Sequence, residues 1–324
     1  MIEACPGCYK PQKRFHYCSI CRRELFDGVK VPPILFFNPP TVEEIKWFHR
    51  QQIRVAMPGK RPKYSLMLED DELALTRENV KGLFIMKLPP VSQPQNYDLL
   101  YNEHLTMQLA RVFDIETAHI AMLYFANHSP ALLIRRFDVE ADGNGHLQES
   151  LLQVSNGLLD PNTVSYEDIG LLIKKYVAAY KPALQSFFQR VIFNHLFSNN
   201  NAGLSSFSIM RTAYGDYKLS PAYSLRCSEL NTADVDDKPI RLYNEVEKAS
   251  RPSSRHRPLD FIILAKKLGI LENRAKMIIE SMTSQDEAVE MLVRKSFLSK
   301  ELKNKYLDLF LNRQDELKKE LHNI

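Results

Sequence analysis

The sequence predicts an α+β protein with a cysteine-rich segment at its front, a β-rich first lobe and a helical second lobe. Three observations lead to this class. Four of the five cysteines lie within the first 21 residues. Short strand patterns separated by turn residues dominate residues 31–135, and long helical patterns follow from residue 165 onward. The predicted divisions are therefore 1–30, 31–135 and 136–324.

The elements are predicted in this order along the chain. Residues 31–40 are expected to form an extended, proline-broken connector, and a capping box of Thr41 and Glu44 predicts a helix over 41–52. The first lobe has predicted strands at 64–68, 72–75, 83–87, 120–124 and 131–135, and one helix at 102–113. The second lobe has predicted helices at 165–179, 182–197, 259–268, 272–281, 284–295 and 299–321, with a hairpin of strands 207–210 and 217–220.

The composition is ordinary for a globular protein. The chain has 324 residues, of which 44% are hydrophobic and 25% charged, and its net charge of +4 reflects 43 basic against 39 acidic side chains. So mild a charge does not by itself indicate nucleic acid or a membrane as partner. The sequence has neither a run of roughly 18 apolar residues nor the features of a signal peptide. We therefore expect a cytoplasmic protein without a membrane partner.

The four N-terminal cysteines form two C-x2-C pairs, Cys5 with Cys8 and Cys18 with Cys21. This spacing allows four thiolates to converge on one tetrahedral Zn²⁺, and so short a segment needs such an ion in order to fold. His16 is a spare candidate ligand. Four free thiols in a loop, or a redox-active C-x-x-C pair, are the alternatives. The sequence therefore predicts a structural zinc knuckle.

Two residues of the first lobe point to a function. Lys87 closes a predicted strand, and Glu103 lies near the start of the following helix. A strand lysine, a helix glutamate and then a helical lobe occur in this order in protein kinases, where the glutamate orients the lysine toward nucleotide phosphates. A surface lysine and a solvated glutamate are the alternative interpretation.

A set of ordered motifs strengthens the kinase interpretation. The motifs are PGKRPKYSL (58–66), FIMKL (84–88), NEHLTMQLA (102–110), LIRRFD (133–138), QE (148–149), FNHLFSN (193–199), FS (207–208) and LSPAY (219–223). Their order and spacing resemble those of HipA-type serine/threonine kinases, the toxin kinases of bacterial toxin–antitoxin operons. The cysteine-rich start resembles a subgroup that has a zinc-binding front. The resemblance implies a bilobal protein-kinase-like fold and a protein partner, either antitoxin-like or of the HipA family.

The resemblance also assigns roles to individual residues. Lys87 matches the phosphate-contacting lysine and Glu103 matches the residue on the following helix, which implies ATP as a ligand. Residues 58–66 resemble a flexible loop on the phosphate side in which family members can be autophosphorylated. Ser65 is the only serine of that segment.

The catalytic segment departs from the family pattern. The family has Gly-Asn-x-Asp-x-His-x-Lys-Asn-Phe-Ser where residues 198–208 read SNNNAGLSSFS. Asn201 therefore replaces the catalytic aspartate, Ser206 replaces the metal-binding asparagine, and Ser224 replaces the metal-binding aspartate. A hinge residue that is usually acidic appears as Arg135. Residues 169–215 contain no Asp or Glu that could take over these roles.

The sequence thus predicts a pseudokinase that serves as a binding or regulatory component of a toxin–antitoxin-type system, with few ligands left for Mg²⁺. One alternative is an active or altered ATP-dependent serine/threonine kinase toxin; Cys227 and His195 flank the segment, but each is more often a buried filler than a catalytic group. The other is a zinc-knuckle regulator that binds nucleic acid through the knuckle and the basic loop 251–258. Direct nucleic-acid contact ranks last, because aromatic residues are missing from that loop.

Overall fold

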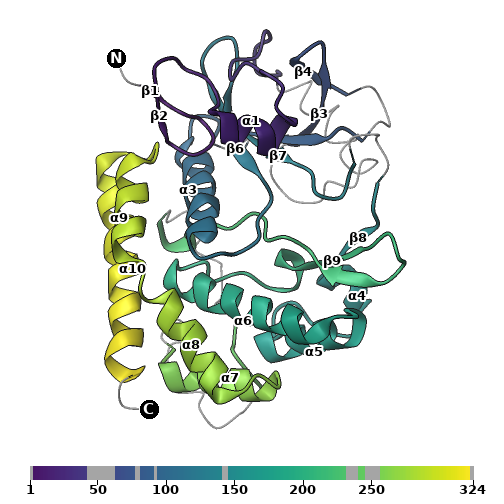
Figure 1. Ribbon diagram of the computed structural model, residues 1–324, viewed down its shortest axis with the longest axis vertical. Coiled ribbons are helices and arrows are strands. Elements are labelled where there is room, and N and C mark those ends of the chain that lie inside the picture. The colour runs from purple at the N-terminus through teal and green to yellow at the C-terminus, as the bar shows by residue number, and fades with distance from the viewer. Residues whose placement is uncertain are drawn as a thin grey trace. The chain divides into compact units, whose positions relative to one another are not determined.

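The computed structural model describes residues 3–41, 63–76, 81–90, 93–140, 145–230, 240–244 and 256–321 (Figure 1). Two compact units make up the chain. Unit 1 comprises residues 1–104, 118–145 and 295–297, and unit 2 comprises residues 105–117, 146–294 and 298–324. The α+β class is confirmed, whereas the linear divisions at residues 30 and 135 remain a prediction.

Unit 1 is built on an antiparallel sheet of five strands. The strands are β3 (Lys63–Glu69), β4 (Glu72–Leu75), β5 (Phe84–Lys87), β6 (Ile120–Tyr124) and β7 (Pro130–Arg135). They lie in the order β4-β3-β5-β7-β6, so that β5 is central and β6 forms one edge. All five were predicted within two residues of their bounds, because each is a short apolar run between turn residues.

The N-terminal segment covers the β6 edge, beside which it runs in purple in Figure 1. The Met122 amide donates to the Pro6 carbonyl at 2.9 Å, and the Leu35 amide donates to the Tyr124 carbonyl at 2.7 Å. Ile34 forms a parallel bridge with Tyr124, as expected for an extended connector. An uncovered edge strand offers unpaired backbone groups to other chains, so this segment protects the sheet.

Helix α3 (Asp98–Val112) lies between strands β5 and β6 in sequence. It begins four residues before the predicted start at residue 102, with Asp98 in its first turn, where a carboxylate is favoured by the helix dipole. Leu100, Leu105 and Leu109 are fully buried along it. The predicted helix over 41–52 lies outside the described residues.

Unit 2 is mainly helical. Its helices are α4 (Leu151–Ser155), α5 (Tyr166–Tyr176), α6 (Tyr180–Leu196), α7 (Pro258–Lys267), α8 (Glu272–Met282), α9 (Asp286–Lys295) and α10 (Lys300–Leu321). A small antiparallel sheet pairs β8 (Gln148–Ser150) with β9 (Ser208–Arg211) and β9 with β10 (Tyr217–Leu219). The hairpin of β9 and β10 was predicted, whereas β8 and α4 were not.

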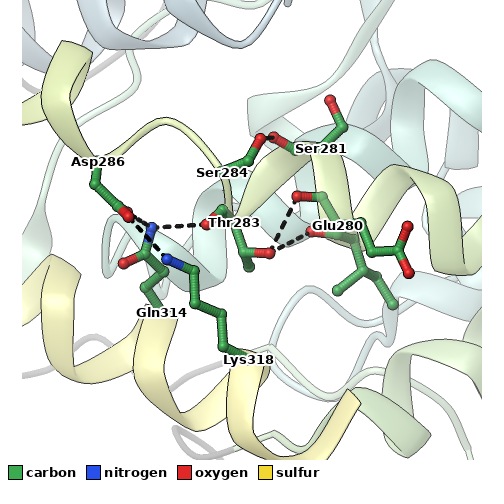
Figure 2. A network of polar contacts seen from close by, with 8 residues as sticks. Glu280, Ser281, Thr283, Ser284, Asp286, Gln314 and Lys318 are labelled. Carbon is green, nitrogen blue, oxygen red and sulfur yellow. Dashed lines mark hydrogen bonds and ion pairs between the residues drawn. The ribbon is translucent and has the colours of Figure 1, made fainter. Parts of the chain in front are cut away.

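A polar network joins the turn between α8 and α9 to helix α10 (Figure 2). Gln314, which is 1% exposed, donates through Nε2 to the Thr283 carbonyl at 3.0 Å and to Asp286 Oδ1. Lys318 Nζ also donates to Asp286, at 2.8 Å, but in an exposed position. The buried amide therefore carries most of the stabilisation.

We expect Gln314→Ala to lower the free energy of unfolding by about 2–3 kcal/mol, because it removes a buried side chain and leaves buried acceptors unpaired. Lys318→Ala is the matched control, since an exposed ion pair contributes about 0.5 kcal/mol or less. Urea unfolding of both variants measures the difference. Equal losses would show that the buried amide contributes no more than the exposed ion pair.

Among the described residues, none of the helices combines the length and apolar character that membrane crossing requires.

Candidate functional site

The four N-terminal cysteines come together in unit 1. Their Sγ atoms all lie within 4.8 Å of one another, and Cys8 Sγ is 3.6 Å from Cys18 Sγ. Cys5 and Cys8 lie in the turn between β1 (Glu3–Ala4) and β2 (Pro11–Gln12), and Cys18 is the N-cap of helix α1 (Ser19–Phe26), which also carries Cys21. The arrangement could hold one metal ion.

The knuckle turn requires glycine between its first two cysteines. A methyl carbon added at Gly7 would lie 2.6 Å from Cys21 Sγ and 3.7 Å from Cys5 Sγ. The Cys18 amide donates to Cys5 Sγ at 3.2 Å, a contact that would help to orient this sulfur as a metal ligand. The sulfurs therefore pack against backbone with no room for a side chain.

The thiols influence one another strongly. Hydrogen bonds from Cys21 and Cys8 hold the pKa of Cys5 well below its usual range, whereas the hydrogen bonds of Cys21 to Cys5 and Cys8, together with burial, raise the pKa of Cys21. A stabilised thiolate is the protonation state that binds metals. His16 is not part of this cluster, since its Nδ1 atom is hydrogen-bonded to the Arg14 carbonyl at 2.7 Å.

Arg135, which stands where the family has an acid, binds the knuckle helix. Its guanidinium makes two hydrogen bonds to the Asp27 carboxylate, at 2.9 and 2.8 Å, and a third to the Leu25 carbonyl at 3.1 Å. Leu25 lies in the last turn of α1, where unpaired carbonyls favour a cation. This departure from the family pattern therefore ties α1 to strand β7.

Lys87 and Glu103 form a buried ion pair in unit 1. Lys87 Nζ donates to Glu103 Oε1, and the two residues are 6% and 2% exposed. Lys87 ends the central strand β5 opposite Leu132 of β7, and Glu103 lies on α3. The structure thus brings together the two residues that the sequence analysis paired. The same pairing of strand lysine and helix glutamate accompanies an ordered nucleotide site in protein kinases.

Ser65 lies in a strand instead of a loop. It belongs to β3 and is 8% exposed, and its Oγ accepts a hydrogen bond from the Gly82 amide at 2.8 Å. The preceding residues 58–62 of the proposed phosphate-side loop lie outside the described residues. A buried serine with an engaged hydroxyl is a poor substrate for modification in this conformation.

Residues 198–208, which the resemblance matches to the catalytic segment, lie in unit 2. There they contact the stretch that carries Tyr223 and Ser224. Ser206 ends the 3-10 turn η1 (Leu204–Ser206) and is half-buried, and Ser224 is exposed at a φ of 56°. The Tyr223 hydroxyl donates to the Ser205 carbonyl at 3.0 Å and contacts Ser208 Oγ at 2.6 Å. The neighbours of Ser206 and Ser224 are therefore hydrogen-bonded to each other.

Asn201 lies at the other end of this segment. Its carbonyl accepts from the Gly203 amide at 2.8 Å, and the preceding Asn200 amide donates to Ser228 Oγ at 3.1 Å. The side chains of Asn201, Ser206 and Ser224 are neutral. Mg²⁺ prefers carboxylate oxygens, and proton removal from a hydroxyl needs a base, so these three groups are poorly suited to phosphoryl transfer.

Glu229 is an acid that the sequence analysis missed. Its Oε1 atom accepts hydrogen bonds from Asn200 Nδ2 at 2.7 Å and from Arg313 at 3.0 Å. Glu229 lies beyond the acid-free stretch 169–215, and the fold of the chain returns it to the segment. Two donors, one of them a guanidinium, already occupy this oxygen.

Cys227 and His195 have no sign of activation. Burial raises the pKa of Cys227 to about 12 and lowers the pKa of His195 well below its usual range. The His195 ring packs against Phe261 with the ring centroids 5.2 Å apart. A nucleophilic cysteine needs a lowered pKa, so these side chains are packing residues of unit 2.

Sequence relatives are found among bacterial kinases. A predicted kinase of Haemophilus influenzae is 27% identical over 186 residues, which are 54% of this chain and 53% of the relative. A predicted kinase of Sinorhizobium fredii is 25% identical over 234 residues, which are 67% of this chain and 56% of the relative. The chain therefore spans about half the length of the curated relatives it matches.

Solved structures with similar folds include a toxin–antitoxin protein and a kinase. HipA of Shewanella oneidensis, solved with HipB and operator DNA, superimposes with a TM-score of 0.65 and 19% identity, covering 82% of this chain and 66% of HipA. The kinase CtkA of Helicobacter pylori superimposes with a TM-score of 0.53 and 12% identity, covering 82% of this chain and 92% of CtkA. The HipA-like C-terminal domain family matches residues 55–289, and the chain belongs to this family.

Proposed function

We propose that this chain is a HipA-family pseudokinase that acts as a binding or regulatory component of a toxin–antitoxin-type system. The observation that carries the proposal is the simultaneous replacement of the base and both metal ligands by Asn201, Ser206 and Ser224. Kinase catalysis depends on positioning and on Mg²⁺ held by such ligands. Loss of one catalytic group commonly costs about three to six orders of magnitude in rate, so loss of the set leaves little.

Glu229 does not restore the lost base. A catalytic base must be free to accept the proton of the substrate hydroxyl. Here the carboxylate is engaged by Asn200 and by the guanidinium of Arg313. Both donors bind the same carboxylate oxygen, Oε1, and would compete there with a substrate hydroxyl.

Nucleotide binding is the retained property that we propose for unit 1. The buried pair of Lys87 and Glu103 supports it, because the same pairing of strand lysine and helix glutamate orients the lysine toward phosphates in protein kinases. ATP would bind without a requirement for Mg²⁺, since the metal ligands are replaced. The alternative is that the ion pair only stabilises the fold. ATP titration of the double variant Lys87→Met/Glu103→Leu distinguishes nucleotide binding from this purely structural role.

Structural zinc is the cofactor that we propose for the knuckle. Four thiolates favour Zn²⁺ over hard cations such as Mg²⁺, and a site with four protein ligands leaves no open position for catalysis. The partner is proposed to be a protein of antitoxin or HipA type. The Shewanella HipA was solved together with HipB, which supports a protein partner.

A thermal-shift titration with ATP, with and without Mg²⁺, tests the proposal beside zinc quantification by mass spectrometry. We expect one zinc per chain and an ATP-induced stabilisation that Mg²⁺ does not increase. Saturating ATP at 100 times its Kd corresponds to about 2.7 kcal/mol, or several degrees. A shift that appears only with Mg²⁺ would contradict the loss of the metal ligands.

A further inference from the structure

The knuckle is linked to helix α3 through one buried hydrogen bond. The Tyr9 hydroxyl lies 2.6 Å from His104 Nδ1, and the two rings meet edge to face with centroids 4.9 Å apart. Tyr9 is 1% exposed and His104 is fully buried. Phe297 closes the cluster, with its ring 5.1 Å from Tyr9 and 5.8 Å from His104. The contact joins residues that are 95 positions apart in the sequence.

The knuckle holds Tyr9 in place. Tyr9 directly follows Cys8 and has a φ of 61°, which non-glycine residues rarely adopt. Its amide donates to the Cys5 carbonyl at 2.9 Å, so its backbone closes the turn that carries two of the metal-binding sulfurs. A backbone held in such a region persists only while its surroundings impose it. The direction of the Tyr9 side chain therefore depends on an intact knuckle.

His104 in turn sets the rotation of helix α3. It directly follows Glu103, and consecutive residues of an α-helix point about 100° apart. Rotation of the helix that displaced His104 would also move Glu103 away from Lys87. A buried ion pair tolerates such misplacement poorly, because its desolvation is offset only by close geometry.

We propose that Tyr9 and His104 are positioning residues that couple the metal knuckle to the Lys87–Glu103 pair. A metal ion bound in the knuckle orients the Tyr9 side chain, and the Tyr9 hydroxyl fixes the position of His104. His104 in turn keeps Glu103 within contact of Lys87. Loss of the metal releases the first half of α3 and exposes Lys87. The consequence for nucleotide binding rests on the function proposed above, whereas the coupling itself does not.

Tyr17 provides a matched control within the same knuckle. It is also fully buried, and its hydroxyl donates to the Met122 carbonyl at 2.9 Å, on strand β6 instead of α3. Tyr9→Phe and Tyr17→Phe therefore remove the same chemical group from the same subdomain. Tyr9→Phe removes the contact to helix α3, whereas Tyr17→Phe removes the contact to strand β6.

The test uses the full-length, zinc-loaded chain and two readouts. Amide hydrogen exchange of residues 98–104 reports the first half of α3, and the rate of Lys87 acetylation, followed by mass spectrometry, reports the ion pair. We expect Tyr9→Phe to speed both by about fivefold, the effect of one lost buried hydrogen bond. Tyr17→Phe is expected to change both by less than about twofold, by the same reasoning. His104→Asn keeps an acceptor near the Nδ1 position. It is therefore expected to raise the exchange and acetylation rates less than His104→Ala does.

Chelation of the metal completes the test. We expect it to speed both readouts in the wild-type chain by at least as much as Tyr9→Phe does. Unchanged readouts in Tyr9→Phe, or equal effects of Tyr9→Phe and Tyr17→Phe, would overturn the coupling. If the chain contains no zinc, the proposed cofactor fails, but the contrast between the two tyrosine variants still decides whether Tyr9 positions α3. Neither readout requires ATP, so failure of nucleotide binding is also distinguishable.

Discussion

Replacing Cys18 with serine is expected to abolish zinc binding and to lower the free energy of unfolding of unit 1 by more than about 3 kcal/mol. The effect is large because the knuckle is part of the core of unit 1. Cys5, Tyr17, Leu25 and Phe26 belong to the same buried cluster as the sheet residues Leu66 and Phe84. So short a segment cannot fold on its own, and its loss also uncovers the β6 edge.

Zinc content and denaturant unfolding, measured together, check this expectation. Cys227→Ser is the matched control, because it changes a buried thiol of unit 2 that lies outside the cluster. It should keep the full zinc content. Gly7→Ala should behave like Cys18→Ser, whereas Gly145→Ala should not, since a methyl carbon at Gly145 would meet its neighbours only at 3.7 Å or more. A Cys18→Ser protein as stable as the wild type would refute a structural metal site.

Replacing Lys87 alone with methionine is expected to cost about 3–5 kcal/mol, because the buried Glu103 carboxylate loses its counter-charge. The double variant Lys87→Met/Glu103→Leu removes both charges and is expected to regain stability to within about 1 kcal/mol of the wild type. Thermal or urea unfolding of the three proteins measures the coupling between the two residues.

ATP titration of the double variant then separates structure from binding. If the pair serves the nucleotide, the stable double variant no longer gains stability from ATP. If the pair is only a structural tie, the double variant responds to ATP as the wild type does. The second outcome would exclude a role of Lys87 in nucleotide binding and would leave the fold assignment unchanged.

Local sequence patterns were sufficient for most elements of the fold. The strands and long helices are continuous apolar patterns bounded by turn residues, so their positions follow from periodicity. The pairing of Lys87 with Glu103 was also predictable, because the order of strand and helix implies it. Helix α1 was missed, since its sequence SICRRELF is short and half polar and follows a cysteine cap. Tertiary contacts, among them those from Arg135, stabilise it.

The remaining site features depend on contacts between distant parts of the chain. Arg135 was identified only as a departure from the family, and its bonds to Asp27 and Leu25 become visible only in the folded protein. Glu229 was overlooked for the same reason, because the search for a replacement acid was confined to neighbouring residues. The Tyr9–His104 contact has no local signature at all. Such pairings are set by the packing of the sheet, helix and knuckle, which periodicity does not encode.

The central claim is that this kinase fold no longer transfers phosphate. The most direct measurement is the intact mass of the purified chain after prolonged incubation with ATP and Mg²⁺, beside the Lys87→Met/Glu103→Leu variant. We predict that neither protein gains the mass of a phosphate, on Ser65 or elsewhere. Phosphate incorporation by the wild-type chain that is lost in the variant would contradict the claim and identify the protein as an active kinase.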